Sequence, residues 1–493
     1  MGVVSKQGVK FTIILYVGII LGYVNTILVF PHILSEEEFG LTRMLAAASA
    51  IVTQFTILGA DNIIIRFSPF FKDEKRQNTI LSIGIVIAFI GFILIGTPFF
   101  IFKDFFIQLF KEKSQLFVDY SYLVIPLAIS LLFYNLFDAY LRVIFKNVFA
   151  VFLNFIFLRV AWLLSVIVYY FEWVSFPTFL WIYVACQSLV TLIVTLYLIY
   201  LGHFKLSFKF NNDVILKLKN ISWFGIFTIL SGISTFMINR LDTVMIGEYI
   251  GLDAVAIYAI AFNMSSVILV PSQALSRTVT VLISNAAKNN DFENLNNLYK
   301  KTAVNQLLFG AIVFALIAVN YTLLMQFLPP FYKDSIYIFL FLGGAKVIDS
   351  AFGANAAIIL NSKYYKIDSI LSIFLLIITF GSNIYFIPRY GVTGASFATA
   401  LSITIYNVMR FLFLKFKMNL SPFDIKYVIG LGICIITAVV PYLVPSFKSI
   451  WVDSILRSIL MLGLFSFLTY FSRISPELNG LLTSTFQKFG IKV

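Results

Sequence analysis

The sequence has few charged residues for its length. Of 493 residues, 12% are Asp, Glu, Lys or Arg, about half the share found in soluble globular domains. Hydrophobic residues make up 60% and gather in long runs, and the mean hydropathy is +0.94. Apolar runs of about 20 residues are typical of transmembrane helices. The composition therefore predicts an integral membrane protein and excludes a cytoplasmic enzyme, a secreted disulfide scaffold and a disordered regulator.

Cysteine and histidine are also scarce, with two residues of each. Cys186 and Cys434 both lie inside apolar runs, so no disulfide framework is expected, and no Cys/His cluster suggests a metal site. No nucleophile–base constellation, phosphate loop or catalytic carboxylate pair stands out. We therefore expect no catalytic residues, no metal and no cofactor, and a protein that is not an enzyme.

Long loops are missing as well. The longest inner connection is about 203–220 and the longest outer one about 103–116. Neither has room for the nucleotide-sugar domain of a membrane glycosyltransferase, or for the large external loop of a polysaccharide polymerase. The function must then lie within or between the helices.

What is present is a series of apolar segments, each long enough to cross a hydrocarbon core of about 30 Å as a helix. The predicted fold class is an all-α polytopic membrane protein with about 14 transmembrane helices. These are 11–33, 40–69, 79–102, 117–141, 147–171, 177–202, 221–246, 254–285, 302–328, 335–360, 367–387, 393–415, 425–445 and 451–472.

The net charge is +13, and the basic residues are unevenly distributed between the two sides of these segments. With the N-terminus inside, 22 Lys and Arg residues fall on inner segments and 6 on outer ones. Because cytoplasmic loops carry the excess of basic residues, this bias places both termini in the cytoplasm.

A weak repeat divides the chain. Short outer turns at 31–40, 247–253 and 388–394 each lead into a helix rich in Ala, Ser or Thr. Such repeats are typical of transporters that rock two halves around a central site. The predicted division is a six-helix lobe 1–202, a basic cytoplasmic linker 203–220, a second six-helix lobe 221–424, and two extra helices with a tail 425–493.

Several stretches carry a resemblance to a known family. They are Gly8 to Pro31, Glu37-Glu38-Phe39-Gly40, Leu58-Gly59, Arg66-Phe67, Asn239 to Gly247 with Tyr258, and Tyr390-Gly-Val-Thr-Gly-Ala395. In these stretches the chain resembles bacterial polysaccharide exporters of the multidrug/oligosaccharidyl-lipid/polysaccharide exporter superfamily.

The resemblance implies a two-lobed flippase of the bacterial inner membrane. Such proteins move an undecaprenyl-diphosphate-linked oligosaccharide from the inner to the outer leaflet for surface polysaccharide assembly, in some cases beside other assembly membrane proteins. The resemblance also implies that the last two helices hold the polyprenyl tail.

Ionisable residues inside apolar helices are costly and tend to mark a pathway or a pair. Some have structural explanations. Arg66, Arg410 and Arg457 lie near helix ends and are expected to extend to the membrane surface. Asp138 with Arg142, and Lys346 with Asp349, have spacings that favour pairs on one helix.

The remaining cations form the predicted substrate site. We expect Arg43, Arg159, Arg240, Arg277 and Lys346 to line a central basic cavity. Guanidinium groups bind phosphate oxygens through two hydrogen bonds and stay charged, so a diphosphate is the ligand they suit. For Arg159 a cavity and an acid on another helix are both open alternatives.

A coupling ion is a separate question. Asp242 with Asn239, and Asn383 or Thr399 on later helices, are candidates to hold Na⁺ or H⁺, while a structural salt bridge is the alternative for Asp242. Two other functions remain open: a cation-coupled multidrug exporter, in which acids should dominate the cavity, and a membrane polymerase of glycan assembly.

Overall fold

The protein is described here from a computed structural model. It covers residues 2–67, 74–204, 237, 240–445, 447–480 and 483; within these, some side chains, including those of 2–12, Arg66 and Arg277, are outside the description. Every regular element in this part of the chain is helical, which confirms the all-α prediction. Ten of the described helices are long and apolar enough to cross a membrane. The protein is therefore a multi-pass membrane protein, and the predicted total of 14 spans stays a prediction.

The chain divides into two compact units, residues 1–259 and 260–493. The helices of the first unit are α1 (Gly2–Tyr23), η1 (Val24–Val29), α2 (Phe30–Ile33), α3 (Glu36–Thr56), α4 (Ala60–Phe67), α5 (Glu74–Gly91), η3 (Phe92–Gly96), α6 (Thr97–Ile101), α7 (Lys103–Lys111), α8 (Gln115–Tyr120), η4 (Ser121–Leu123), α9 (Val124–Val143), α10 (Val148–Phe152), η5 (Leu153–Phe157), α11 (Leu158–Tyr170), α12 (Phe176–Tyr200), α14 (Leu241–Tyr249) and the greater part of α15 (Leu252–Ser266).

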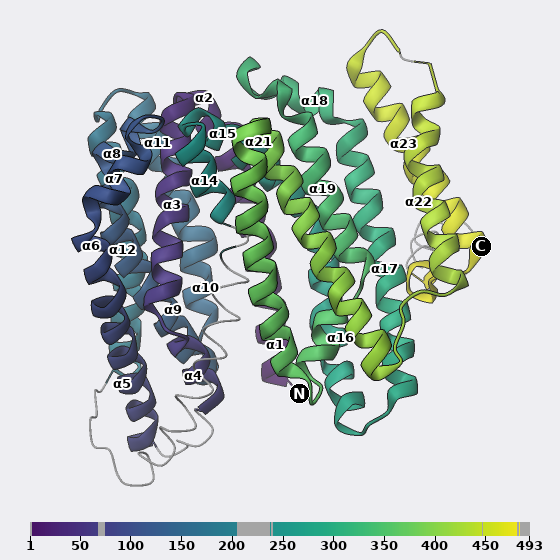
Figure 1. Ribbon diagram of the computed structural model, residues 1–493, viewed down its shortest axis with the longest axis horizontal. Coiled ribbons are helices and arrows are strands. Elements are labelled where there is room, and N and C mark those ends of the chain that lie inside the picture. Colours follow the sequence, from purple (N-terminus) through teal and green to yellow (C-terminus); the bar gives the residue numbers. More distant parts are fainter. Residues whose placement is uncertain are drawn as a thin grey trace. The chain divides into compact units, whose positions relative to one another are not determined.

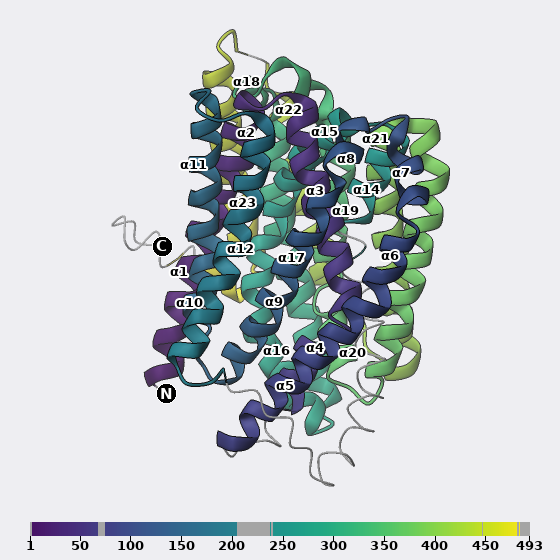
Figure 2. The same ribbon diagram turned by 90° about the vertical axis from the view of Figure 1, so that its left-hand side faces the viewer.

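Helix α9 is the centre of the first unit and packs against α3, α4 and α12 (Figure 2). Small hydroxyl side chains join these helices. Ser49 donates to the carbonyl of Val124 at 3.1 Å, and Thr53 donates to that of Ala128 at 3.0 Å. In a membrane, where lipid competes poorly for polar groups, such contacts help to hold helices together.

The turn before α3 explains part of the motif that carries the resemblance. Ser35 and Glu38 form a reciprocal capping box at the start of the helix, which satisfies two otherwise unpaired backbone donors. One turn later, Gly40 packs so closely on the backbone of Leu252 that a Cβ there would overlap its carbonyl oxygen. The motif is thus required locally by capping and close packing.

Several predictions of regular structure need correction. The segment 335–360 is not one helix, because it divides near Gly353 (φ 60°) into α19 (Ile336–Ala351) and α20 (Asn355–Leu360). The segment 40–69 is not one helix, because Leu58 (φ 45°) and Gly59 (φ 69°) break it into α3 and α4. Left-handed backbone at two successive residues cannot continue an α-helix. The outer connection 103–116 is not a loop, since its first nine residues form α7.

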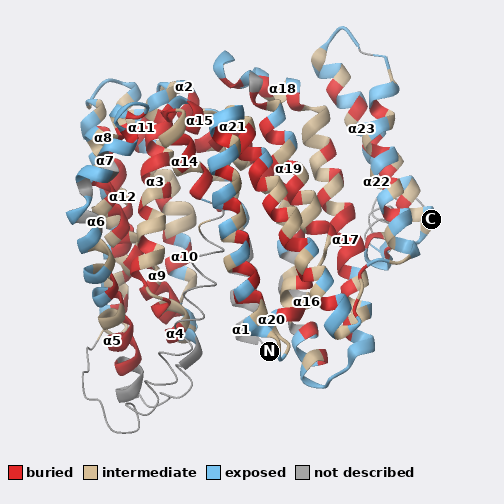
Figure 3. Cartoon of the chain, in the orientation of Figure 1, coloured by how far each residue is buried: buried red, intermediate tan, exposed pale blue. Residues whose placement is uncertain are grey.

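The second unit begins within α15. Its remaining helices are η6 (Val267–Leu269), α16 (Val270–Lys288), α17 (Phe292–Val319), α18 (Tyr321–Gln326), η7 (Pro330–Ser335), α19 (Ile336–Ala351), α20 (Asn355–Leu360), α21 (Tyr365–Met418), α22 (Ile425–Leu443) and α23 (Ile450–Ser472) (Figure 1). Helix α17 packs against α16, α19, α22 and α23. Figure 3 shows that α22 and α23 each bury only a narrow strip and expose the rest, which is apolar and suits contact with lipid.

Element α21 consists of two helices that meet at Gly391. This residue has φ 60° and ψ −143°, a conformation that is essentially restricted to glycine. The break confirms the predicted separation of the helices 367–387 and 393–415. It also turns the chain back, so that the two halves of α21 lie side by side (Figure 1).

The predicted lobe boundaries stay predictions, because most of the linker 203–220 lies outside the described residues. Helix α14, which we assigned to the second lobe, packs against α3 of the first unit, where Gly247 faces Met44.

Candidate functional site

The first unit brings three of the five predicted substrate-binding residues together. Arg43, on α3, is partly buried and lies over two aromatic rings, with its guanidinium carbon 5.2 Å from the centroid of Phe30 and 5.1 Å from that of Phe39. Ring faces attract a cation without neutralising it. Arg43 is therefore oriented by aromatic faces and keeps its charge.

Arg159 begins α11 and points at α1. Its guanidinium donates a hydrogen bond to the carbonyl of Gly18 and lies 5.3 Å from the ring centroid of Phe155. A Cβ on Gly22 would come within 2.5 Å of the guanidinium, so the absence of a side chain there makes the room for it. The Gly18 and Gly22 pair on α1 thus accommodates a cation as well as a close helix contact.

Arg240 lies at the start of α14 and its side chain is exposed. Arg43 is near enough to interact electrostatically with both Arg159 and Arg240. In the described part of the chain, none of the three forms an ion pair with a carboxylate. Within its described residues, the first unit therefore brings three arginines together that no carboxylate neutralises.

A tyrosine that the sequence analysis missed completes this cluster. Tyr183, on α12, is 1% exposed and lies within electrostatic range of both Arg43 and Arg240. Its ring stacks on Trp162 with centroids 4.6 Å apart and planes 11° apart, and Trp162 donates to the Tyr183 carbonyl at 3.1 Å. No spacing rule links Tyr183 to arginines on α3 and α14, so only the packing identifies it.

This arrangement suits an anion that can accept several hydrogen bonds. Aromatic rings hold the guanidinium groups of Arg43 and Arg159, and a backbone carbonyl also holds that of Arg159. Within the described residues, no carboxylate pairs with these two arginines or with Arg240. We call Arg43, Arg159, Arg240 and Tyr183 the arginine cluster. Its role in binding substrate stays a prediction.

The other two predicted cations lie in the second unit. The side chain of Arg277, on α16, is outside the described residues. Lys346, on α19, is buried at 7% exposure, and its ammonium lies 5.6 Å from the ring centroid of Phe262. Their participation in one site with the arginine cluster stays a prediction.

The candidate ion-coupling residues are mostly buried. Asp242 is 2% exposed and accepts a hydrogen bond from the Tyr258 hydroxyl at 2.5 Å. Asn383 and Thr399 are buried on the two halves of α21, and Asn239 lies outside the described residues. A cation at these residues stays a prediction.

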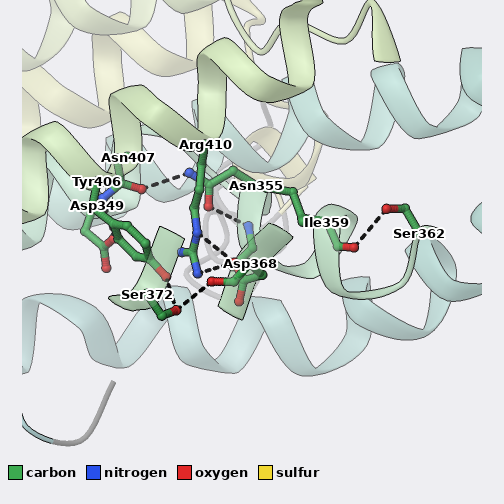
Figure 4. A network of polar contacts seen from close by, with 10 residues as sticks. Asp349, Asn355, Ile359, Ser362, Asp368, Ser372, Tyr406, Asn407 and Arg410 are labelled. Atoms are coloured by element: carbon green, nitrogen blue, oxygen red, sulfur yellow. Dashed lines mark hydrogen bonds and ion pairs between the residues drawn. The ribbon is translucent and has the colours of Figure 1, made fainter. Parts of the chain in front are cut away.

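Arg410 contradicts our expectation that it extends to the membrane surface. Its guanidinium donates to Asp368 at 3.0 and 2.6 Å and lies 3.9 Å from the ring centroid of Tyr406. Figure 4 shows Arg410 reaching across to Asp368 on the opposite half of α21. A buried carboxylate partner makes exposure to the interface unnecessary, so proximity to a helix end was a poor guide.

The same region holds a chain of amides that the sequence analysis also missed. Asn355 donates to Asn407 at 2.8 Å, and Asn407 donates to Asp349 at 2.8 Å (Figure 4). These bonds join α19, α20 and the second half of α21. Because these side chains satisfy one another's hydrogen bonds, the network links these helices structurally.

Arg457 is a second correction. It pairs with Asp453 at 2.8 Å and donates to the carbonyls of Pro441 at 2.9 Å and Val444 at 3.2 Å. These carbonyls lie at the end of α22, where helix carbonyls lack internal donors. Arg457 thus fastens α23 to the end of α22. The predicted pair of Asp138 and Arg142 is confirmed, with the Arg142 Nε donating to Asp138 at 2.8 Å.

Residues 5–283 match the family described as polysaccharide biosynthesis protein. A search of curated proteins finds no match.

Solved structures of the same architecture are similar to the chain at low identity. The lipid II flippase MurJ in an inward closed conformation is 16% identical, covers 94% of this chain and 100% of its own, and has a TM-score of 0.72. An inward-facing multidrug resistance MATE family transporter of the MOP superfamily is 15% identical, with 84% and 98% covered and a TM-score of 0.63. A MOP superfamily transporter from Pyrococcus furiosus, described as having a binding pocket of reverse polarity, is 16% identical, with 84% and 96% covered and a TM-score of 0.54.

At these identities the similarity shows the fold alone, which the chain shares with these structures. The family match spans more than half of the sequence. The chain therefore belongs to the polysaccharide biosynthesis protein family.

Proposed function

We propose that this protein is a flippase that moves an undecaprenyl-diphosphate-linked oligosaccharide from the inner to the outer leaflet of the bacterial inner membrane. It would work by alternating access, with both termini in the cytoplasm, and supply surface polysaccharide assembly. The family supports a place in polysaccharide biosynthesis, and the fold supports transport.

The observation that carries this proposal is the arginine cluster. A diphosphate crossing bare hydrocarbon would meet a penalty of tens of kcal/mol by Born estimates. Arg43, Arg159 and Arg240 offer charged donors that no carboxylate in the described residues engages. In this proposal they replace water around the diphosphate, while the polyprenyl tail stays in lipid.

The membrane potential can supply the direction. Moving one negative charge out of a cell with a negative interior gains about 2.3 kcal/mol per 100 mV, and a diphosphate with two charges gains about twice that. Export then needs no obligatory ion. A Na⁺ or H⁺ at Asp242, Asn239, Asn383 and Thr399 is a second possible source of energy.

The cluster also separates this proposal from the alternatives. A cation-coupled multidrug exporter needs acids where its substrate binds, whereas the groups that meet around Arg43 are two further arginines and a tyrosine. A polymerase would need catalytic groups, and the arginine cluster offers no nucleophile–base pair.

Complementation of a strain that lacks its own exporter tests the proposal. We expect Arg43→Ala and Arg240→Ala each to reduce surface glycan at least tenfold with normal amounts of protein in the membrane. Arg389→Ala is the matched control, because Arg389 is also close to an aromatic ring, with its guanidinium 3.8 Å from the centroid of Tyr385, but lies on α21, which carries no member of the arginine cluster. Normal glycan export from both cluster variants would refute the proposal.

A further inference from the structure

The first unit has an apolar surface cavity away from the arginine cluster. A cavity of about 350 Å³ opens between α1, α10 and α12. Its walls are apolar and come mainly from Ile14, Val148, Phe149 and Phe152, with Lys146 at one side. The volume is within the range of sites that hold small ligands.

Two polar groups at this cavity have no partner among the described residues. Lys146 is exposed, and neither its ammonium nor the Tyr197 hydroxyl makes a hydrogen bond or ion pair within the described residues. The ring of Tyr197 rests against Phe149 with centroids 4.8 Å apart. The cavity thus combines an unpaired cation and a hydroxyl with an apolar wall.

The backbone around Lys146 forms part of the rim of the cavity. Phe145 adopts a left-handed conformation with φ 57° and is 66% exposed. Its amide donates to the carbonyl of Arg142, and that of Lys146 to Leu141, which ends α9 in a tight turn. A bulky residue rarely takes this conformation, and here the turn places Phe145 and Lys146 together at the rim.

The cation and the apolar side chains follow one another along the cavity in the order of a lipid's headgroup and acyl chain. The distribution of basic residues assigns Lys146 to the inner membrane surface, and Val148, Phe149 and Phe152 follow it along the next helix. A phosphate headgroup at Lys146 would therefore have its chain against progressively deeper apolar side chains.

We propose that this cavity binds an anionic diacyl phospholipid of the inner leaflet, with its phosphate at Lys146 and Tyr197 and one acyl chain along Ile14 and Phe152. Among the described residues that line the cavity, Lys146 is the one cation, and its ammonium complements a single phosphate charge. The arginine cluster is separate, since Gly22, beside Arg159, is eight residues or about 12 Å along α1 from Ile14. The lipid holds the inner end of α1 against α10. This inference does not depend on the proposed transport substrate.

Native mass spectrometry of the full-length protein in detergent tests the proposal. The probes are dioleoylphosphatidylglycerol, dioleoylphosphatidylcholine, which has the same chains and no net charge, and a polyprenyl phosphate. We expect the wild type to retain phosphatidylglycerol about fivefold better than phosphatidylcholine, the effect of one basic residue near an anionic surface. Lys146→Gln should abolish this preference, and Val148→Phe, which fills the cavity, should weaken both lipids.

Lys448→Gln is the control, because Lys448 is likewise an exposed lysine between two helices but belongs to the second unit. It should bind lipid as the wild type does. A preference for phosphatidylglycerol that survives Lys146→Gln overturns the proposal. It is also overturned if the wild type retains the polyprenyl phosphate better than phosphatidylglycerol and Val148→Phe abolishes that retention. If Val148→Phe fails to fold, the surface variant Lys146→Gln still decides the matter.

Discussion

At the scale of single residues, the arginine cluster shows how cations can be kept inside a membrane protein without acids. Arg43 rests on two rings, and Arg159 donates to the carbonyl of Gly18. Neither contact removes charge. Both orient a guanidinium group while most of its donors stay available, which is what recognition of a phosphate requires.

Gly22→Ala tests the placement of Arg159 without removing it. The added methyl would lie 2.5 Å from the guanidinium and displace it, so we expect glycan export to fall about as much as in Arg159→Ala. Gly381→Ala is the control, because that helical glycine has open space around it. Export is measured by complementation, and unchanged export in Gly22→Ala would show that the position of Arg159 does not matter.

The sequence predicted the arginines of the cluster better than the residues that contact them. Arg43, Arg159 and Arg240 were recognised because a charge in an apolar run is conspicuous. The carbonyl of Gly18 was not, because every residue has one and only the register of α1 against α11 selects it. Tyr183 was missed for a similar reason, since burial of an aromatic residue is common in membrane helices.

At the scale of secondary structure, α21 depends on contacts between its two halves. Gly391 permits the turn, and the ion pair of Asp368 with Arg410 joins the halves far from that turn, 42 residues apart in sequence. Apolar runs predicted both helices and the break between them. They could not predict the pair, because helical periodicity gives the face of one helix but not its register against another.

Asp368→Asn should destabilise the protein markedly. The variant leaves Arg410 buried without a carboxylate, and breaking such a pair costs about 3–5 kcal/mol. The measurement is the thermal midpoint of the detergent-solubilised protein, followed by size-exclusion chromatography. The double variant Asp368→Leu with Arg410→Met should recover much of the loss, since it leaves no buried charge; an equally unstable double variant would contradict this account.

At the scale of the whole molecule, composition alone predicted an all-α membrane protein, and motifs along the chain predicted a relation to polysaccharide biosynthesis proteins, the family whose model matches. The sequence did not predict the two compact units, 1–259 and 260–493. The boundary that composition placed in the basic stretch 203–220 stays a prediction. In the structure, Gly247 of α14 faces Met44 of α3, and Gly40 of α3 contacts Leu252 at the start of α15. Such contacts depend on tertiary packing, which a repeat pattern does not specify.

The central claim is that unpaired arginines carry a diphosphate across the membrane, and transport by the purified protein in proteoliposomes tests it most directly. The substrates are an undecaprenyl-diphosphate-linked sugar and a polyprenyl glycoside with the same sugar and no phosphate. The account predicts transport of the diphosphate lipid alone, slowed at least tenfold by Arg43→Ala or Arg240→Ala and unchanged by Arg389→Ala. Equal transport of both lipids, or full activity of both cluster variants, would contradict it.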